Sequence, residues 1–330
     1  YLSGPGVTTF VNDSALFGGY PGSQNVIARS GDPAPGTAGA MFNYGFTGVS
    51  SAVVQVNRAG QVFFRQGVNG GDTTTSNDEG LFTGTPGSLS MVLREGDSLG
   101  GGLTAAAFTQ SGIQMDNSGH ALFEVVLGGA VTAASDRSLW LYTPGSGNTP
   151  VIREGDPAPG TIGATFNNPL DNWSPTLYPT SLTRSGKFLL GPFLMNGDVV
   201  GGVNDQMLYI GQVGGGLTPV ARAGSPAPGT DAVFRFFNTS TCGLNDSGIL
   251  AIVGILTGGS TTTSNNTGIW VGAAGSLSLV ARQGDPAPRV PAELRGLDRF
   301  VARKQIVRML EAQGLLAKTE SHQHAVRRCY

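Results

Sequence analysis

Residues 153–161 read Arg-Glu-Gly-Asp-Pro-Ala-Pro-Gly-Thr, and copies of this stretch recur along the chain. The copies begin at Arg29, Arg94, Arg153, Arg222 and Arg282. Successive arginines are 65, 59, 69 and 60 residues apart, and one copy carries Ser225 in place of the aspartate. Recurrence at a nearly constant spacing is typical of tandem structural repeats. The chain is therefore predicted to be an array of similar units.

A second recurring feature is a polar turn that ends in glycine, first seen as Asn57-Arg-Ala-Gly60. An apolar run follows each copy, and the turn glycines are Gly60, Gly119, Gly186 and Gly248. Asn and Gly tolerate the positive φ that tight hairpin turns require. We expect each of these turns to join two antiparallel strands.

The second unit shows most clearly how the units fold. Runs rich in β-branched and aromatic residues predict strands at residues 51–56, 61–66, 80–84 and 88–94. The two prolines of the GDPAPG segment cannot donate to a sheet ladder, so this segment is expected to be an extended, non-pairing connection. No helical periodicity appears before residue 290.

Four short strands per unit predict an all-β fold, a β-propeller-like array of four-stranded blades. The units end near residues 36, 101, 160, 229 and 288, which makes about four and a half repeats within a 1–288 domain. That number is low for a closed ring. Further blades are therefore expected before Tyr1 or after Pro288.

One aromatic residue stands twelve or thirteen residues before each recurring arginine. The series is Phe17, Phe82, Trp140, Tyr209 and Trp270. A regular position in each unit favours a place in the core between blades. The alternative is an aromatic surface that binds glycans.

Composition suits an exported protein. Only 13% of the residues are charged, against about 25% in typical globular domains, and Gly accounts for 52 residues. Residues 1–288 hold eleven Lys and Arg against eighteen Asp and Glu, a net charge of −7 that disfavours nucleic-acid binding. No window is long and apolar enough for a membrane span, and no signal peptide opens the sequence. The expected location is extracellular or at the cell surface.

The last 42 residues differ in composition from the array. Residues 289–330 hold nine Lys and Arg against four Asp and Glu, a net charge of +5. Asp298 can cap a helix from Arg299 to about Gln313, with Gly314 as its stop signal. The sequence therefore predicts a short α-helical C-terminal tail that is separate from the β array.

Two resemblances follow from these motifs. The Asn-x-x-Gly turn and the GDPAPG segment of residues 1–288 resemble the tandem NxxGxxAF repeat proteins of bacteria, which implies export and a repeat fold but no activity. Residues 290–330 resemble valyl-tRNA synthetase, at the return from the editing insertion towards the catalytic core. The HIGH and KMSKS signatures of that family are missing from the sequence. We interpret the tail as a synthetase-like fragment of a chimeric chain.

The recurring aspartates are the first candidates for chemistry. Asp32, Asp97, Asp156 and Asp285 invite a calcium hypothesis, since this cation prefers oxygen ligands. Each is a lone carboxylate, and all but Asp97 stand beside prolines, which favours a structural role, either a turn hydrogen bond or an ion pair with the preceding arginine. No cofactor is expected. The recurring Arg, Asp and turn Gly residues are predicted to be structural.

Histidines and cysteines provide no clear site. His120 is the sole histidine of the array and is interpreted as a polar strand residue rather than a general base. His322, His324 and Cys329 resemble a metal cluster, but too few ligands follow for a closed zinc site.

Three functions are weighed. The first is a non-enzymatic exported bacterial protein that binds a glycan or a cell-surface protein, or acts as a surface-structural module. The alternative is a secreted hydrolase or lyase that acts on polysaccharide through paired carboxylates in the central channel. A further alternative is a partial valyl-tRNA synthetase, expected to be inactive.

Overall fold

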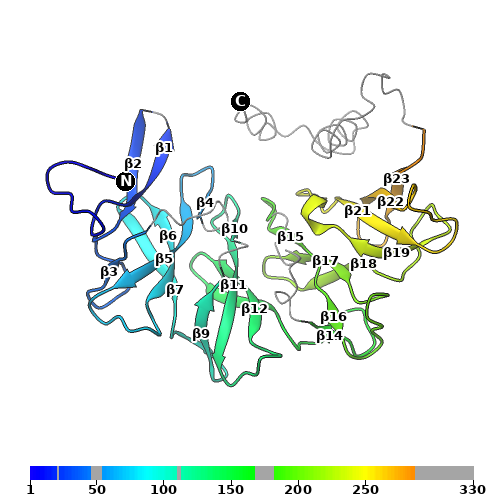
Figure 1. Ribbon diagram of the computed structural model, residues 1–330, viewed down its shortest axis with the longest axis horizontal. Helices are drawn as coiled ribbons and strands as arrows, with labels where there is room; N and C mark the ends of the chain where they lie inside the picture. Colours follow the sequence, from blue (N-terminus) through cyan, green and yellow to red (C-terminus); the bar gives the residue numbers. More distant parts are fainter. Residues whose placement is uncertain (21, 46–53, 110–112, 168–181, 287–330) are drawn as a thin grey trace.

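A computed structural model of the chain describes residues 1–20, 22–45, 54–109, 113–167 and 182–286. Within these residues the protein is all-β, and the only helix is a 3-10 turn at Thr239–Thr241. Figure 1 shows antiparallel sheets that follow one another in an arc, from the β1–β2 hairpin at one end to β22 and β23 at the other. The all-β prediction is thus confirmed. The predicted helical tail and the domain boundary at residues 288–289 lie outside the described residues.

The strands fall into a hairpin and four successive groups. The hairpin consists of β1 (Ala15–Tyr20) and β2 (Ser23–Arg29). Group 1 consists of β3 (Met41–Phe42), β4 (Val54–Val56), β5 (Val62–Asn69), β6 (Glu79–Thr85) and β7 (Ser88–Arg94). Group 2 consists of β8 (Ser98–Gly100), β9 (Leu103–Phe108), β10 (Gln114–Met115), β11 (Ala121–Gly129), β12 (Arg137–Thr143) and β13 (Gly147–Arg153).

The two remaining groups complete the arc. Group 3 consists of β14 (Thr165–Phe166), β15 (Lys187–Leu190), β16 (Leu194–Met195), β17 (Met207–Gln212) and β18 (Leu217–Arg222). Group 4 consists of β19 (Val233–Phe237), β20 (Gly243–Leu244), β21 (Leu250–Thr257), β22 (Thr267–Gly272) and β23 (Ser278–Arg282).

Groups 1, 2 and 4 share one strand order. A leading strand (β3, β9 or β19) pairs with the end of a long strand (β5, β11 or β21), and two further strands follow. The orders are β3-β5-β6-β7, β9-β11-β12-β13 and β19-β21-β22-β23. A short extra strand (β4, β10 or β20) pairs with the beginning of the long strand. In group 3 the long strand is broken into β15 and β16 on either side of Pro192. Proline has no N–H for the ladder, which explains the break. An isolated bridge from Phe193 to Gln206 continues the pairing towards β17.

The GDPAPG segments pair with the leading strands, so the prediction of a non-pairing connection was wrong. The amide of Gly31 donates to the carbonyl of Phe42, and the amide of Phe42 donates to the carbonyl of Asp32, both at 2.9 Å. The same two bonds join residues 155–156 to Phe166. The prolines remove only their own donors, whereas the neighbouring glycine and aspartate still contribute a donor and an acceptor.

The strand expected at residues 51–56 is described only as β4, and it pairs with the first three residues of β5. The far end of β5 pairs with β3 instead, through Met41 with Asn69 and Phe42 with Val68. The long strand is therefore bordered by two different segments along one edge. Residues 80–84 and 88–94 form strands as predicted, within β6 and β7.

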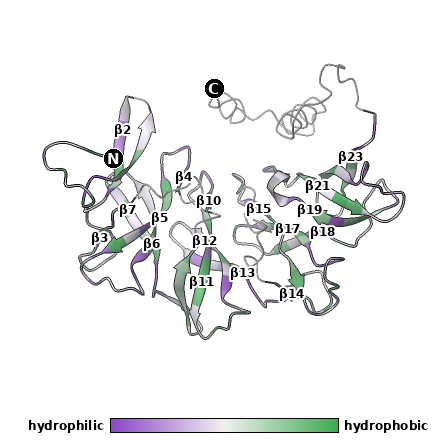
Figure 2. Cartoon of the chain, in the orientation of Figure 1, coloured by the Kyte–Doolittle hydropathy of each residue, from purple (hydrophilic) through white to green (hydrophobic). Residues whose placement is uncertain are grey.

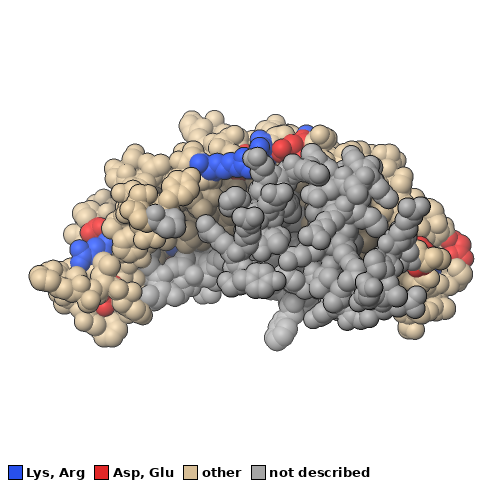
Figure 3. Space-filling model, turned by 90° about the horizontal axis from the view of Figure 1, so that it is seen from above, with Lys and Arg blue, Asp and Glu red and all other residues tan. Residues whose placement is uncertain are grey.

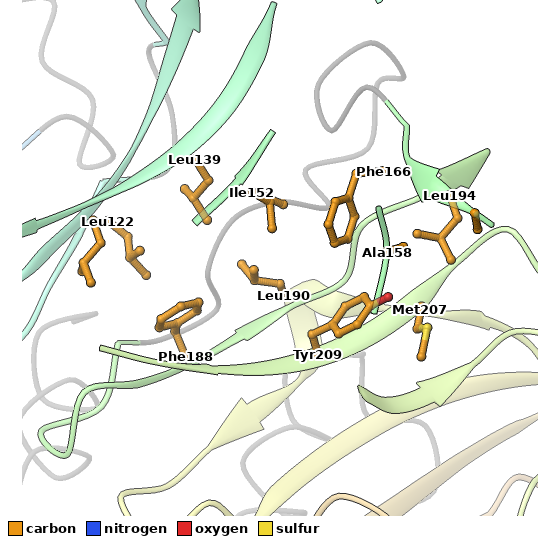
Figure 4. Packing of buried hydrophobic residues seen from close by; sticks show 12 residues of the cluster. Leu122, Leu139, Ile152, Ala158, Phe166, Phe188, Leu190, Leu194, Met207 and Tyr209 are labelled. Carbon is orange, nitrogen blue, oxygen red and sulfur yellow. The ribbon is translucent and has the colours of Figure 1, made fainter. Parts of the chain in front are cut away.

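The sheets bury apolar side chains on both faces, and each core lies between two consecutive groups. In β6, Leu81 packs in the core shared with group 2, while the next residue, Phe82, packs in the core shared with the hairpin. Figure 4 shows the equivalent core between groups 2 and 3, where Leu122 and Leu139 point towards Phe188. Figure 2 shows the hydrophobic residues following the strands. No group covers both of its own faces, so neighbouring groups stabilise one another.

The aromatic series occupies one recurring position. A register shift precedes each member, between Leu81 and Phe82 and likewise between Ile269 and Trp270. Phe82, Tyr209 and Trp270 are fully buried and Trp140 is 5% exposed, whereas Phe17 at the free end of the arc is 45% exposed. Four of the five side chains therefore belong to the cores between groups and cannot line an exposed glycan-binding surface.

Because exposure differs among the five aromatic residues, we expect their replacement by alanine to destabilise the protein to different extents. We expect Trp270→Ala to lower the free energy of unfolding by about 3–5 kcal/mol, because it leaves a cavity, and Phe17→Ala to lower it by less than about 1 kcal/mol. The tryptophan change also removes the hydrogen bond from its Nε1 to the carbonyl of Pro228. Urea unfolding of both variants measures the difference, and equal costs would contradict the packing described.

Candidate binding surface

The five recurring arginines make the same contact in every copy. Each Nε donates to a carbonyl 17 or 18 residues earlier; the acceptors are Asn12 for Arg29, Asn77 for Arg94, Ser135 for Arg153, Asn204 for Arg222 and Asn265 for Arg282, at 2.7–2.9 Å. In groups 1 to 4 the acceptor belongs to the loop before β6, β12, β17 or β22. The arginine is the last residue of the next strand, β7, β13, β18 or β23. The guanidinium, with its rigid fork of donors, thus fixes that loop against the sheet.

Two of these arginines also bind a carboxylate in the same loop. Arg94 Nη1 lies 2.8 Å from Asp72 Oδ2, and Arg222 reaches both oxygens of Asp198 at 2.6 and 3.1 Å. Hydrogen bonds from the arginines lower the pKa of both aspartates below their ordinary value, against the opposing effect of desolvation. Sequence reasoning missed Asp72 and Asp198, since they stand far from the recurring motif.

The recurring aspartates serve their own turns. The Oδ2 atoms of Asp97, Asp156 and Asp285 accept the backbone N–H of the arginine three residues earlier, at 2.7, 3.0 and 2.9 Å. In the copies at Arg29 and Arg222 the amides of Asp32 and Ser225 donate to the arginine carbonyl, at 3.1 and 3.2 Å. Of the two structural roles predicted, these contacts match the turn hydrogen bond.

In the described residues, the acidic side chains are not grouped as a calcium site requires. In the described part of the chain, no group of three or more His, Cys, Asp or Glu residues is placed to hold a metal ion. Asp97, Asp156 and Asp285 already direct an oxygen to a backbone amide. Such lone carboxylates fall well short of the six to eight oxygen ligands that calcium takes.

The glycine turns use side-chain oxygens as internal acceptors. Asn57 Oδ1 accepts the amides of Ala59 and Gln61, and Asp116 Oδ1 accepts those of Ser118 and His120. The turn glycines have a positive φ, with values of 78° for Gly60, 86° for Gly119, 75° for Gly186 and 86° for Gly248. A side chain at these positions would strain the backbone, which explains the recurrence of glycine.

His120 belongs to one of these turns. Its Nδ1 lies 2.7 Å from Asp116 Oδ2, and the Asp116 side chain is almost fully buried. Because Asp116 also accepts two amides, the pair holds the turn in place and has a structural role. His322, His324 and Cys329 lie outside the described residues. Cys242 is buried, which raises the pKa of its thiol to about 11 and leaves it unreactive.

The glycine turns touch in two pairs, between groups 1 and 2 and between groups 3 and 4, and we call all four the turn row (residues 57–60, 116–119, 183–186 and 245–248). The amide of Arg58 donates to Asn117 Oδ1 at 3.1 Å, and Ser185 Oγ donates to the carbonyl of Asp246 at 2.7 Å. Lys187 Nζ donates to the same carbonyl at 3.0 Å. Figure 1 places β4, β10 and β15, which adjoin these turns, on the inner side of the arc.

The turn row presents exposed polar groups. Arg58, Arg184 and Asp246 are exposed, and Asn117 is half-buried. Figure 3 views the molecule from above, and charged side chains are sparse among the described residues on that face. Hydrogen-bonding groups on paired turns can bind a polar ligand, and in the described residues these turns bring together no nucleophile and base.

Buried carboxyl groups are the feature that sequence reasoning missed entirely. Burial raises the pKa of Glu124 to about 7, although its Oε2 accepts a hydrogen bond from Thr109 Oγ1 at 2.7 Å. Burial also raises the pKa of Glu95 to about 7, with a further contribution from a hydrogen bond to Asp78. The one signal for Glu124 is its position inside an apolar strand, Ala121–Gly129.

Fold and surface define the class of this protein as an all-β stack of antiparallel sheets with a row of polar turns along one side. The chain belongs to a family of unknown function (DUF7453), which matches residues 1–304. The resemblance to NxxGxxAF repeat proteins stays an expectation.

A second, short similarity concerns valine–tRNA ligases. The enzyme of Legionella pneumophila (strain Paris) is 44% identical over 52 residues, which cover 16% of this chain and 6% of that protein. The enzyme of Mesorhizobium japonicum is 65% identical over 34 residues, which cover 10% of this chain and 4% of that protein. The chain thus spans only a small part of the length of these relatives. The predicted resemblance to valyl-tRNA synthetase is confirmed as a short partial match.

The arginine contacts predict a loss of stability that is specific to position. We expect Arg222→Met to lower the thermal unfolding midpoint by on the order of 5 °C, because a charged donor is lost from three hydrogen bonds. Arg235→Met, at an exposed position of β19, is the matched control and should leave the midpoint within about 1 °C. Calorimetry on both variants checks this, and equal midpoints would refute the role given to Arg222.

The raised pKa of Glu124 predicts that the free energy of unfolding depends on pH. Unfolded glutamate ionises near its ordinary value of 4.5, whereas folded Glu124 keeps its proton up to about pH 7. Between these values the folded state holds more protons, so this group makes stability fall as pH rises. We expect Glu124→Gln to match the original protein at pH 4.5 and to exceed it by on the order of 2 kcal/mol above pH 7. Urea unfolding across this range is the measurement, and a pH-independent difference would contradict it.

Proposed function

We propose that the chain is a non-enzymatic, exported bacterial protein that acts as a binding or surface-structural module, and that its sheet groups are blades of a β-propeller-like array. The shared strand order of groups 1, 2 and 4 and the cores between consecutive groups support the array. The low share of charged residues, 13%, supports export. The relatives named above are bacterial proteins.

The turn row carries the proposal. Hydrogen bonds join the turns of groups 1 and 2, through the backbone amide of Arg58 and Asn117, and those of groups 3 and 4, so exposed guanidinium, amide and carboxylate groups lie on paired turns. Such groups bind the hydroxyls of a sugar in pairs, since guanidinium and amide donors and carboxylate acceptors are planar and directional. A preformed surface also loses little conformational entropy on binding. A glycan is therefore the proposed ligand, with a cell-surface protein that carries it as the wider partner.

The hydrolase or lyase alternative has one observation in its favour, the carboxyl pair of Asp78 and Glu95. Their side chains are hydrogen-bonded to each other, whereas glycosidases hold their two carboxyls about 5 Å or more apart. Asp78 also lies next to the start of β6, and its carbonyl accepts the amide of Val68 near the end of β5. The turn row adjoins the opposite end of β5. The pair therefore lacks the separation of glycosidase carboxyls and lies away from the turn row.

We propose no ligase activity for the synthetase-like segment. The matched stretch covers 6% of the Legionella enzyme. The HIGH and KMSKS signatures do not occur in the sequence of this chain.

A glycan array, paired with a hydrolysis screen on the same sugars, tests the proposed function. We expect binding without turnover. Arg58→Ala and Asp246→Ala should each weaken binding at least tenfold, or by about 1.4 kcal/mol, because both exposed side chains contact the ligand. Arg235→Ala, a surface change on β19 away from the turn row, is the control and should leave binding unchanged. Turnover of any bound sugar, or binding that survives both turn-row changes, would overturn the proposal.

A further inference from the structure

Most cations of the array have a structural partner. Residues 1–288 contain eleven Lys and Arg, and all of them are described by the structure. Lys187 Nζ donates to the carbonyl of Asp246. Arg58, Arg184 and Arg235 are exposed, and within the described residues no ion pair or side-chain hydrogen bond involves their guanidinium groups. The other seven bind a loop carbonyl or pair with a carboxylate; they are Arg29, Arg65, Arg94, Arg137, Arg153, Arg222 and Arg282.

Two of the three free arginines hold the same position in the turn row. Arg58 and Arg184 are the second residues of their turns, where the partner turns have Asn117 and Asp246. Asn117 Oδ1 accepts the amide of Arg58 at 3.1 Å, and Asp246 Oδ1 accepts the amide of Ser185 at 3.3 Å. Each touching pair of turns therefore directs a side-chain acceptor to its own backbone and exposes an arginine to solvent.

Other acceptors of the turn row are also used within the protein. Asn57 Oδ1 accepts two amides. Asp116 Oδ1 accepts two amides as well, and its Oδ2 lies 2.7 Å from the Nδ1 atom of His120. The guanidinium groups of Arg58 and Arg184, by contrast, have only donors to offer. Exposed cationic donors complement a ligand that is rich in anionic acceptors, such as carboxylate or sulfate groups.

The turn row has an excess of positive charge within an acidic array. Arg58, Arg184 and the adjoining Lys187 stand against two carboxylates, those of Asp116 and Asp246. The Asp116 side chain is only 1% exposed. The array as a whole has eleven Lys and Arg against eighteen Asp and Glu, a net charge of −7. The local sign of the charge is therefore opposite to that of the whole array.

Several acidic side chains lie at the other end of the long strands. Asp72 follows β5 and Asp198 follows β16, whereas the turn of Arg58 precedes β5. Figure 1 shows β3 and β16 on the outer side of the arc and β4 and β15 on its inner side. The eight residues of β5 span about 26 Å. Because the Debye length is about 8 Å at physiological ionic strength, these acidic loops do not cancel the charge of Arg58.

We propose that the glycan bound by the turn row is an anionic polysaccharide, with acidic groups placed against Arg58 on one pair of turns and against Arg184 on the other. This inference rests on the proposed function, because it names the class of glycan that the same surface binds. Two similar sites on one chain favour a polymer with repeated acidic groups, since contact with both sites raises the affinity above that of either. Bidentate pairing of guanidinium with carboxylate or sulfate oxygens supplies the selectivity.

Two matched pairs of polymers test the charge requirement. Polygalacturonate is compared with its methyl ester, which keeps the sugar backbone and removes the charge, and dextran sulfate is compared with dextran. We expect at least one charged polymer to bind at least about tenfold more tightly than its neutral counterpart. The two pairs distinguish carboxylate from sulfate as the acidic group. Raising the salt concentration from about 0.01 to about 1 M, which shortens the Debye length from about 30 to about 3 Å, should weaken this binding.

Variants of the three free arginines assign the binding to the turn row. Arg58→Gln and Arg184→Gln should each weaken binding of the charged polymer at least about tenfold, because a charged donor is lost. Arg235→Gln removes the free arginine outside the turn row, so it is the matched control and should bind like the original protein. Arg58→Lys and Arg184→Lys keep the charge and should bind more tightly than the glutamine variants. Circular dichroism confirms that each variant is folded.

The possible failures are distinguishable. If uncharged sugars bind as tightly as charged ones, or if binding survives both glutamine changes, the inference is overturned; in the first case the proposed function still stands. Absence of binding to any sugar would overturn the proposed function and this inference together. A single-stranded DNA oligonucleotide provides an anion of another class. Binding of this oligonucleotide as tightly as the polysaccharide, with the same loss in Arg58→Gln and Arg184→Gln, would assign the site to nucleic acid and overturn the inference.

Discussion

In the described residues, the sheets of groups 1, 2 and 3 bury apolar side chains on both faces, and neighbouring groups supply the cover. In β17, Leu208 packs towards group 4 while the adjacent Tyr209 packs towards group 2. Burial of such side chains contributes about 1.5–3 kcal/mol each, and here it is available only when a neighbouring group is in place. The order of the groups along the arc follows from this single constraint.

Polar contacts in the loops add to the stability that core packing provides. Once the cores set the distance between groups, the loops around the sheets must satisfy their own amides and carbonyls. The arginines do so through contacts such as that from Arg222 to the carbonyl of Asn204, and the turns do so through side chains such as Asn57. Because these devices recur at matching positions, the turns of groups 1 and 2, and those of groups 3 and 4, come into hydrogen-bonding distance. The turn row is thus a product of core spacing and turn chemistry together.

The sequence correctly predicted features that depend on interactions between residues a few positions apart. The glycine turns formed where Asn57 and Gly60 indicated, and the aromatic position of Trp270 was rightly assigned to a core. Pairings between distant segments were misjudged. Residues 41–42 border the far end of β5 and pair with the GDPAPG segment, which was predicted to be a non-pairing connection. Pro192 interrupts a strand whose continuation depends on Gln206. The burial of Glu124 was not predicted from the sequence, because it depends on the neighbouring strands.

The sequence by itself determined the all-β class, the turn positions and the recurring aromatic position, because these depend on backbone preferences and residue spacing. Only the tertiary structure decided which edge each leading strand borders, which loop carbonyl each arginine binds and which turns become neighbours. Those features arise when separate groups meet at a distance set by their side chains, and no stretch of sequence encodes that distance alone.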